Sequence, residues 1–169
     1  MKPVRIFSFL VTLAFACAFA VRGSGATTFQ KNTAYFNNEY GLEESSEIVT
    51  SYQFLHPSFG FTELVEEFSV RKYKRRELEI EAVFRRRDMK LFAVTFRRPR
   101  VWEEGELASQ LAGFGSRWRR LSDWDYNFVS GEGVRASYQA RTLYMVSALA
   151  LGTIEQREEE RRKAEEKKS

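Results

Sequence analysis

The grouped arginines are the residues of this sequence that could most readily bind a ligand. Four short basic runs lie between residues 71 and 120, and tryptophans stand among them. A guanidinium binds carboxylate or phosphate through paired hydrogen bonds, and an indole ring can stack on bases or sugars. The pattern therefore indicates a basic and aromatic surface for an anionic ligand. The candidate binding residues are Arg85, Arg86, Arg87, Arg97, Arg98, Arg100, Trp118, Arg119 and Arg120.

A second interpretation is that these arginines pair with acids of the same chain. Residues 27–70 hold seven acids and one base, whereas residues 71–100 hold twelve bases and four acids. Segments of opposite charge form ion pairs within a fold, and most such pairs lie on the surface. The sequence alone leaves both interpretations open.

The three consecutive arginines Arg85, Arg86 and Arg87 are the sharpest case. On an extended strand their side chains would alternate between faces, but at a turn all three can point into solvent. Asp88 offsets only one of the three charges. We therefore expect an exposed cluster that contributes to binding an anionic partner. Replacing the trio with serine is then expected to leave the melting temperature nearly unchanged.

Metal and nucleophilic chemistry have little support in this sequence. His56 is the only histidine and Cys17 the only cysteine. A zinc site needs more nitrogen and sulfur ligands, and Asp123-x-Asp125 is the nearest approach to an oxygen-lined calcium loop. We expect no metal, no cofactor and no catalytic residue, with His56 structural or exposed. A non-enzymatic protein is therefore favoured over an enzyme.

The element that positions the central arginines is a predicted hairpin over residues 77–99. Apolar residues recur at every second position in residues 78–84 and again in residues 92–96. Period-two alternation on both sides of a short polar run is typical of an antiparallel hairpin with one buried face. We expect the rings of Phe84, Phe92 and Phe96 on that inner face.

Helical spacing predicts two packed helices, over residues 62–74 and 103–113, and one short helix near residues 41–51. Beyond Ile154 nearly every residue is charged, which predicts a solvated helical tail over residues 154–169. Within this tail we expect ion pairs four residues apart, between Glu158 and Arg162 and between Glu159 and Lys163.

Further strands are predicted around the glycine-containing turn at residues 131–133, over residues 126–130 and 134–139, with a final strand over 141–147. Together these elements predict an α+β fold in one domain, residues 27–153. It consists of an antiparallel sheet of about five strands with two helices packed on one face.

The N-terminus predicts the compartment. Lys2 and Arg5 precede an uncharged apolar run over residues 6–21, and small residues end at Ala20 and Ala26. This arrangement is typical of a secretory signal peptide, here residues 1–26, and the run is shorter than the roughly 20 residues that span a bilayer. We expect a secreted or periplasmic protein without a transmembrane span after cleavage. The alternative is an uncleaved membrane anchor.

Signal cleavage would also change the charge. The chain has 27 bases and 23 acids, and three of the bases but none of the acids precede Thr27. The mature chain would therefore carry 24 bases and 23 acids and no cysteine. A nearly neutral exported protein argues against nucleic acid as the partner. An unknown protein or an anionic envelope component, such as lipid headgroups or acidic glycans, fits the compartment better.

Residues 60–65 read G-F-T-E-L-V, which matches a G-x-T-x-x-V opening. Over about residues 60–96 the chain thus resembles small secreted bacterial domains of the β-lactamase-inhibitor-protein and outer-membrane-assembly-lipoprotein type. In those domains such an opening starts a helix that packs on a following hairpin. This chain departs from them because no Gly-x-Pro follows the first helix and Cys17 lacks the usual lipobox leucine. The resemblance implies an envelope binding protein without catalysis.

The favoured function is therefore an exported, non-enzymatic binding module that presents a basic and aromatic surface to an anionic envelope partner. Two alternatives stay open. One is a hydrolase that acts on an acidic envelope polymer, and the other is a structural subunit that assembles through its tail helix.

Overall fold

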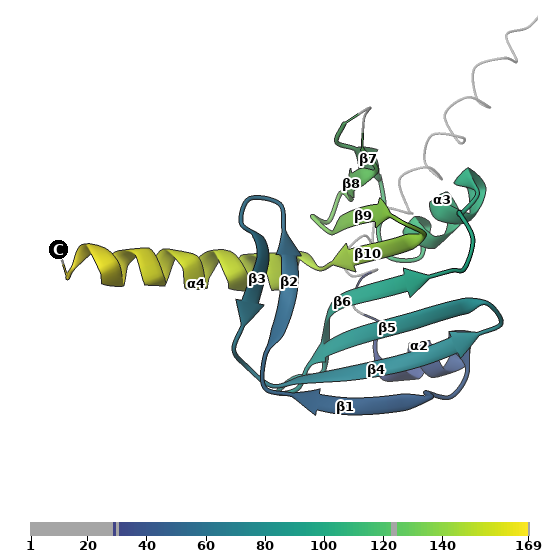
Figure 1. The fold of residues 1–169 in the computed structure, drawn as a ribbon, viewed down its shortest axis with the longest axis horizontal. Coiled ribbons are helices and arrows are strands. Elements are labelled where there is room, and N and C mark those ends of the chain that lie inside the picture. The colour runs from purple at the N-terminus through teal and green to yellow at the C-terminus, as the bar shows by residue number, and fades with distance from the viewer. Residues whose placement is uncertain (1–28, 30, 123–124, 169) are drawn as a thin grey trace, which may run out of the picture.

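The computed structural model describes residue 29, residues 31–122 and residues 125–168 (Figure 1). The predicted signal peptide and Trp124 lie outside this part of the chain. The described helices are α2 (Thr33–Tyr40), α3 (Glu104–Ala112) and α4 (Ala148–Glu166). The strands are β1 (Ser45–Val49), β2 (Tyr52–His56), β3 (Gly60–Leu64), β4 (Phe68–Arg75), β5 (Leu78–Arg85), β6 (Lys90–Arg97), β7 (Arg119–Arg120), β8 (Asn127–Val129), β9 (Arg135–Gln139) and β10 (Thr142–Val146).

The sheet is larger than the sequence suggested. Eight strands form one antiparallel sheet in the order β1-β4-β5-β6-β10-β9-β8-β7, and β2 and β3 form a separate two-stranded hairpin. The α+β class with an antiparallel sheet is confirmed. The prediction of about five strands with two packed helices is wrong, because residues 45–75 form four strands instead of helices.

The predicted helix over residues 62–74 fails for a physical reason. Strand β4 lies between β1 and β5 and is buried on two faces. Phe68 and Val70 face one core and Tyr73 faces the other, so the strand lacks clean alternation and its apolar residues fall at helix-like spacings. The short helix predicted near residues 41–51 is also wrong. The helix lies just before, capped by the Asn32 side chain and ended at Gly41, whose φ is 91°.

The predicted hairpin over residues 77–99 is confirmed as β5 and β6, with one β-bulge. Val83 pairs with Ala93 and Phe84 pairs with Leu91, so Phe92 is the extra residue. The bulge reverses the alternation at this point. Phe84 and Phe96 therefore lie in one core and Phe92 in the other, although all three are fully buried.

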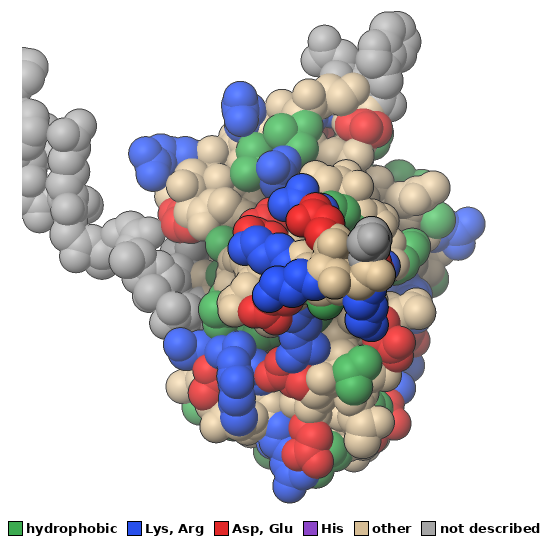
Figure 2. Space-filling view, turned by 90° about the vertical axis from the view of Figure 1, so that its left-hand side faces the viewer, with side chains coloured by type: hydrophobic (Ala, Val, Ile, Leu, Met, Phe, Trp, Pro, Cys, Tyr) green, Lys and Arg blue, Asp and Glu red, His purple; other side chains and the backbone are tan. Residues whose placement is uncertain are grey.

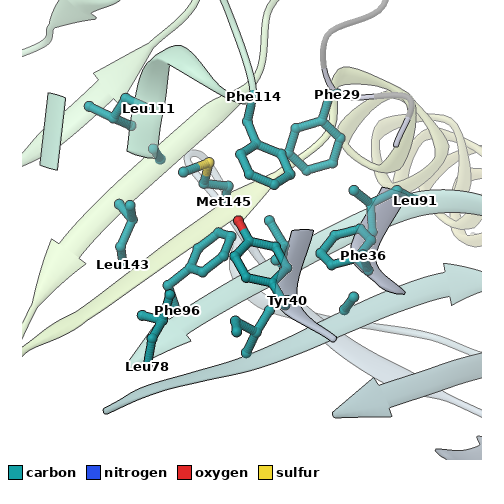
Figure 3. Packing of buried hydrophobic residues seen from close by; sticks show 14 of the residues in the cluster. Phe29, Phe36, Tyr40, Leu78, Leu91, Phe96, Leu111, Phe114, Leu143 and Met145 are labelled. Atoms are coloured by element: carbon teal, nitrogen blue, oxygen red, sulfur yellow. The ribbon is translucent and has the colours of Figure 1, made fainter. Parts of the chain in front are cut away.

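Two hydrophobic cores lie on opposite faces of the sheet. The first is covered by α2 and α3, and Figure 3 shows the rings of Phe29, Phe36 and Phe114 gathered within it. The Phe36 ring stacks on Tyr73 with centroids 5.5 Å apart, which ties α2 to β4. The second core packs apolar residues of the β2–β3 hairpin and of α4 against the other face of β4, β5, β6 and β10. One half of the second face is thus covered.

The other predicted elements near the site are confirmed. Helix α3 begins at Glu103, where a capping box with Glu106 forms, and ends at Ala112. Strands β8 and β9 flank the glycine-containing turn, and β10 is the predicted final strand. These elements bring β10 next to β6, which places residues 142–146 in the middle of the sheet.

Helix α4 combines a buried start with a solvated end. Ser147 caps it, and Ala150, Leu151 and Ile154 are buried, while the later turns project away from the body (Figure 1). The predicted tail over residues 154–169 is therefore the continuation of a helix that begins at Ala148. If this end of the helix contacts another subunit, charged side chains would have to form that contact.

The ion pairs of the tail are confirmed in part. Lys163 Nζ lies 2.6 Å from Glu159, as the four-residue spacing predicts. Glu158 pairs instead with Arg161, at 2.6 Å, and Arg162 lies 3.9 Å from Glu166. Three-residue and four-residue partners are neighbours on a helix surface, so sequence spacing alone does not choose between them.

The turn at residues 131–133 is held by the carboxylate of Glu132. It accepts hydrogen bonds from the Ser116 backbone N–H, at 2.9 Å, and from Ser116 Oγ. Burial acts to raise the pKa of the Glu132 carboxyl, but these bonds and one from Ser130 outweigh it and lower the pKa to about 2. Ionised Glu132 therefore stabilises the contact between this turn and the segment before β7.

A Glu132→Gln variant is expected to show a weaker dependence of stability on acid pH. Because the folded pKa lies below the ordinary value of 4.5, the ionised form stabilises the fold above that pH. This contribution is lost as the pH falls from 4.5 towards about 2. Thermal melts across this window should therefore decline more steeply for the wild type than for the variant. Parallel declines would contradict the assignment.

Candidate functional site

Arg85 is a structural residue of the hairpin turn. Its side chain is 7% exposed and donates from Nε and Nη2 to both carboxylate oxygens of Asp88, at 3.0 and 2.6 Å. Its guanidinium also lies over the Phe92 ring, 4.8 Å from the centroid. The hydrogen bonds that Arg85 donates to Asp88 raise the pKa of Arg85 against the effect of its burial. The expectation that all three arginines of the trio point into solvent is therefore wrong for Arg85.

The other two members of the trio are exposed but lie beside acids. Arg86 Nη1 donates to Glu67 at 2.9 Å, and Arg87 Nε lies 3.8 Å from Glu66. Glu66 also accepts from Arg157 of α4 at 2.8 Å, and this contact fastens α4 to the loop before β4. The acids beside Arg86 and Arg87 come from the acidic first part of the chain, as the internal interpretation proposed, whereas the close partner of Arg85 is Asp88.

Arg98 and Arg100 converge on one carboxylate at the start of α3. Arg100 donates to both oxygens of Glu106, at 2.7 and 2.8 Å, and lies 3.0 Å from Glu77. Arg98 also donates to Glu106, and its guanidinium lies 4.6 Å from the centroid of the Trp102 ring. Hydrogen bonds from Arg100 are the main cause that lowers the pKa of Glu106. These two arginines hold α3 against the end of the hairpin.

The aromatic part of the predicted surface is also engaged within the fold. Trp118 is half-buried against the first core, and its Nε1–H donates to the Leu111 carbonyl at 2.7 Å. Arg120 lies over the Tyr126 ring, 4.4 Å from the centroid, whereas Arg119 is exposed on the edge strand β7. The predicted binding residues therefore do not meet in one basic and aromatic surface.

Charge of both signs is interspersed over the molecule. Figure 2 shows basic and acidic side chains intermingled on the face from which α4 projects. Among the predicted binding residues, Arg97 on β6 and Arg119 on β7 are exposed, and within the described chain no carboxylate lies at ion-pair distance from either. Of these two, Arg97 lines a groove, and its surroundings define the candidate site.

Arg97 lines an open groove between the β2–β3 hairpin and the face of the main sheet. The groove has a volume of about 690 Å³, which is within the range of sites for small ligands. Gln53, Leu55 and Phe61 line it from the hairpin, where Leu55 and Phe61 are a cross-strand pair. The Phe61 side chain is 74% exposed. The groove thus combines an apolar wall with a polar floor.

The floor consists of two rows of side chains that cross the strands β4, β5, β6, β10 and β9 in turn. Residues in register on antiparallel neighbours lie on the same face, so each row is continuous across the sheet. The next row of this face is apolar on β4, β5, β6 and β10, where the hairpin and α4 cover it, and ends at Arg135 on β9. The two open rows are Lys72, Glu81, Thr95, Tyr144 and Ser137, and Lys74, Glu79, Arg97, Thr142 and Gln139.

The carboxylates of these rows already have partners. Tyr52 Oη donates to Glu81 at 2.7 Å, and Lys72 Nζ lies 4.0 Å from the same carboxylate. Lys74 Nζ lies 3.9 Å from Glu79. Burial, and then the bond to Glu81, raise the pKa of Tyr52, so this hydroxyl stays a donor at neutral pH. The groove therefore presents an uncompensated positive charge only where Arg97 lies, among its described residues.

Both ring nitrogens of His56 have contacts within the fold. His56 is buried, and its Nδ1 accepts from the Ser58 backbone N–H at 3.0 Å. Its Nε2 lies 3.2 Å from Glu155 of α4, and its ring stacks on Phe59 with centroids 4.5 Å apart. These contacts fix the tip of the β2–β3 hairpin against α4. The histidine thus holds one wall of the groove in place.

Within the described residues, no cluster of three or more histidine, cysteine, aspartate or glutamate side chains is arranged to hold a metal ion. No helix in the same part of the chain is both long and apolar enough to cross a membrane. Comparison of the chain with protein-family models, curated proteins and solved structures gives no match. The resemblance over residues 60–96 stays a prediction, although the helix expected there is a strand.

Most groove residues were absent from the predicted binding set, which included only Arg97 of this group. A signal for them exists in the sequence. Polar residues alternate with core residues at Thr95 and Arg97, at Ser137 and Gln139, and around Tyr144. Such alternation predicts a polar second face for each strand. Which strands lie side by side, and hence which polar residues meet, depends on the tertiary structure.

Proposed function

We propose that the protein is an exported, non-enzymatic binding module whose ligand is anionic and whose ligand-binding site is the groove between the β2–β3 hairpin and the sheet. Export rests on the N-terminal sequence. The site rests on one observation, which is an open groove with a single uncompensated guanidinium on its floor. An arginine in this setting can take a carboxylate or related group through two parallel hydrogen bonds.

The proposed anionic site excludes most of the clustered arginines. Arg85, Arg98 and Arg100 are held by carboxylates of the same chain at 3.0 Å or less. An external anion would have to displace those carboxylates. Arg97 has no carboxylate at ion-pair distance in the described chain, because Glu79, its neighbour in the row, lies 3.9 Å from Lys74. An anion at Arg97 therefore has no ion pair to displace.

An Arg97→Gln variant of the exported chain is expected to bind anionic polymers about tenfold more weakly, because hydrogen bonds to a charged group contribute about 1.5–3 kcal/mol. The measurement is titration calorimetry with polyuronate, polyglutamate and heparin. Arg87→Gln is the matched control, since it also removes one exposed arginine but lies outside the groove. Equal affinity of the Arg97 variant and the wild type for every polymer would reject the groove as the anionic site.

A hydrolase that acts on an acidic polymer is the second candidate. Glu79 and Glu81 point from the same face of β5 into the groove, and paired carboxylates can cleave glycosidic bonds. Both carboxylates are engaged by neighbouring side chains, which favours binding over catalysis. Chain-length analysis of the polymer after prolonged incubation separates the two functions. Shortened polymer chains that form with the wild type but not with Glu81→Gln would establish the enzyme.

A further inference from the structure

We propose that the ligand of the groove is an acidic oligosaccharide that lies across strands β5, β6, β10 and β9, with a sugar ring against Phe61 and a carboxylate on Arg97. This inference rests on the proposed function and names its ligand class.

The groove floor offers side chains but no free backbone groups. Strands β5, β6, β10 and β9 each pair with neighbours on both sides, so their N–H and C=O groups are used within the sheet. A peptide that adds a strand needs an unpaired edge. The main-sheet edge strands β1 and β7 do not line the groove, whereas the hairpin strands β2 and β3 each have one open edge at its wall. A ligand that lies along the floor, on the main sheet, therefore carries its own donors and acceptors.

Neutral side chains that both donate and accept dominate the floor. Hydroxyl and amide groups match sugar hydroxyls, which likewise donate and accept. Side chains within a row recur at the spacing of neighbouring strands, about 4.8 Å. This spacing is close to the advance of one pyranose unit along an extended oligosaccharide. The neutral polar residues of the groove are Gln53, Thr95, Ser137, Gln139, Thr142 and Tyr144.

Phe61 supplies the surface on which a sugar ring can lie. Its side chain projects from the hairpin wall beside Leu55 and is largely exposed. The C–H face of a pyranose is apolar and packs flat against an aromatic ring, while its hydroxyls stay free to reach the polar rows. An aromatic wall beside a hydroxyl-rich floor therefore fits a saccharide better than it fits polyglutamate or a lipid chain.

The charge of the lining selects a sparsely charged polymer. Three acids and two bases line the groove, and the acids are Glu44, Glu79 and Glu81. Densely charged chains such as sulfated glycans or nucleic acids require many cations along the site. An oligosaccharide with one free carboxylate among otherwise neutral rings places a single negative charge at Arg97 and neutral hydroxyls elsewhere. This balance points to an oligosaccharide with a single free uronic acid unit.

The test uses the exported full chain and an oligogalacturonate methyl-esterified at all but one carboxylate, with the fully methyl-esterified form and polyglutamate as comparison ligands. We expect oligogalacturonate to bind, and esterification or Arg97→Gln to weaken it about tenfold. Phe61→Ala should weaken it by a similar factor, because stacking on an aromatic side chain contributes this much in comparable sites. Val65→Ala is the control, since it shortens an exposed apolar side chain just after the same hairpin and outside the groove.

Two outcomes overturn the inference in different ways. Binding of polyglutamate as tight as that of oligogalacturonate, with no effect of Phe61→Ala, would reject a saccharide while leaving an anionic binding module in place. Absence of binding to any of the acidic polymers, with melting curves showing a folded protein, would reject both the ligand class and the proposed function.

Discussion

Replacing Phe96 with alanine is expected to lower the free energy of unfolding by about 3–5 kcal/mol, the usual cost of removing a fully buried ring. The Phe96 side chain has no solvent exposure and lies with its centroid 5.4 Å from that of Phe114 and 6.0 Å from that of Tyr40. The variant would leave a cavity where β6, α2 and the segment after α3 meet. In a domain of this size the melting temperature should fall by about 10–20 °C.

Phe92→Ala extends the experiment to the second core, where the ring contacts Phe54 and Phe68 at centroid distances of 5.8 and 5.6 Å. A loss of similar size is expected. Phe61→Ala is the control, since the same substitution at an exposed ring should change stability by no more than about 0.5 kcal/mol. Melts of the Phe96 and Phe92 variants that match the control would contradict the two-core packing.

Arg85→Ser is expected to destabilise the fold by about 2–4 kcal/mol. Breaking a buried ion pair costs about 3–5 kcal/mol, and the partial exposure of Asp88 reduces this figure. The substitution also removes the guanidinium from the Phe92 ring. This expectation replaces the one drawn from the sequence, in which serine at all three positions left the melting temperature unchanged.

Arg87→Ser supplies the matched comparison within the same turn. Its side chain is 69% exposed and its nearest carboxylate lies 3.8 Å away, so we expect a change within about ±0.5 kcal/mol. Chemical denaturation of both variants measures the difference directly. Equal stabilities would mean that Arg85 makes no net contribution, and the internal pairing of the trio would then have no structural role.

Local pattern was sufficient for the elements whose partners are adjacent in sequence. The β5–β6 hairpin, helix α3 and the β8–β9 turn follow from alternation, capping residues and glycine positions within short windows. Over residues 78–82 of β5 and 94–97 of β6 buried residues alternate with more exposed ones, so the periodicity of apolar residues can be recognised in the sequence. The burial of Phe84 and Phe96 follows from the same alternation.

Only the tertiary structure decided which residues meet across the chain. The sequence of strand β4 has helix-like apolar spacing because both faces of the strand are buried. The β2–β3 hairpin and α4 cover the second of these faces. Glu66 and Arg157, which form an ion pair, are 91 positions apart. Whether an arginine is free or paired depends on such distant partners. The composition of the chain therefore indicated an anionic ligand, but the order of the strands determined that Arg97, and not the arginine trio, faces the open groove.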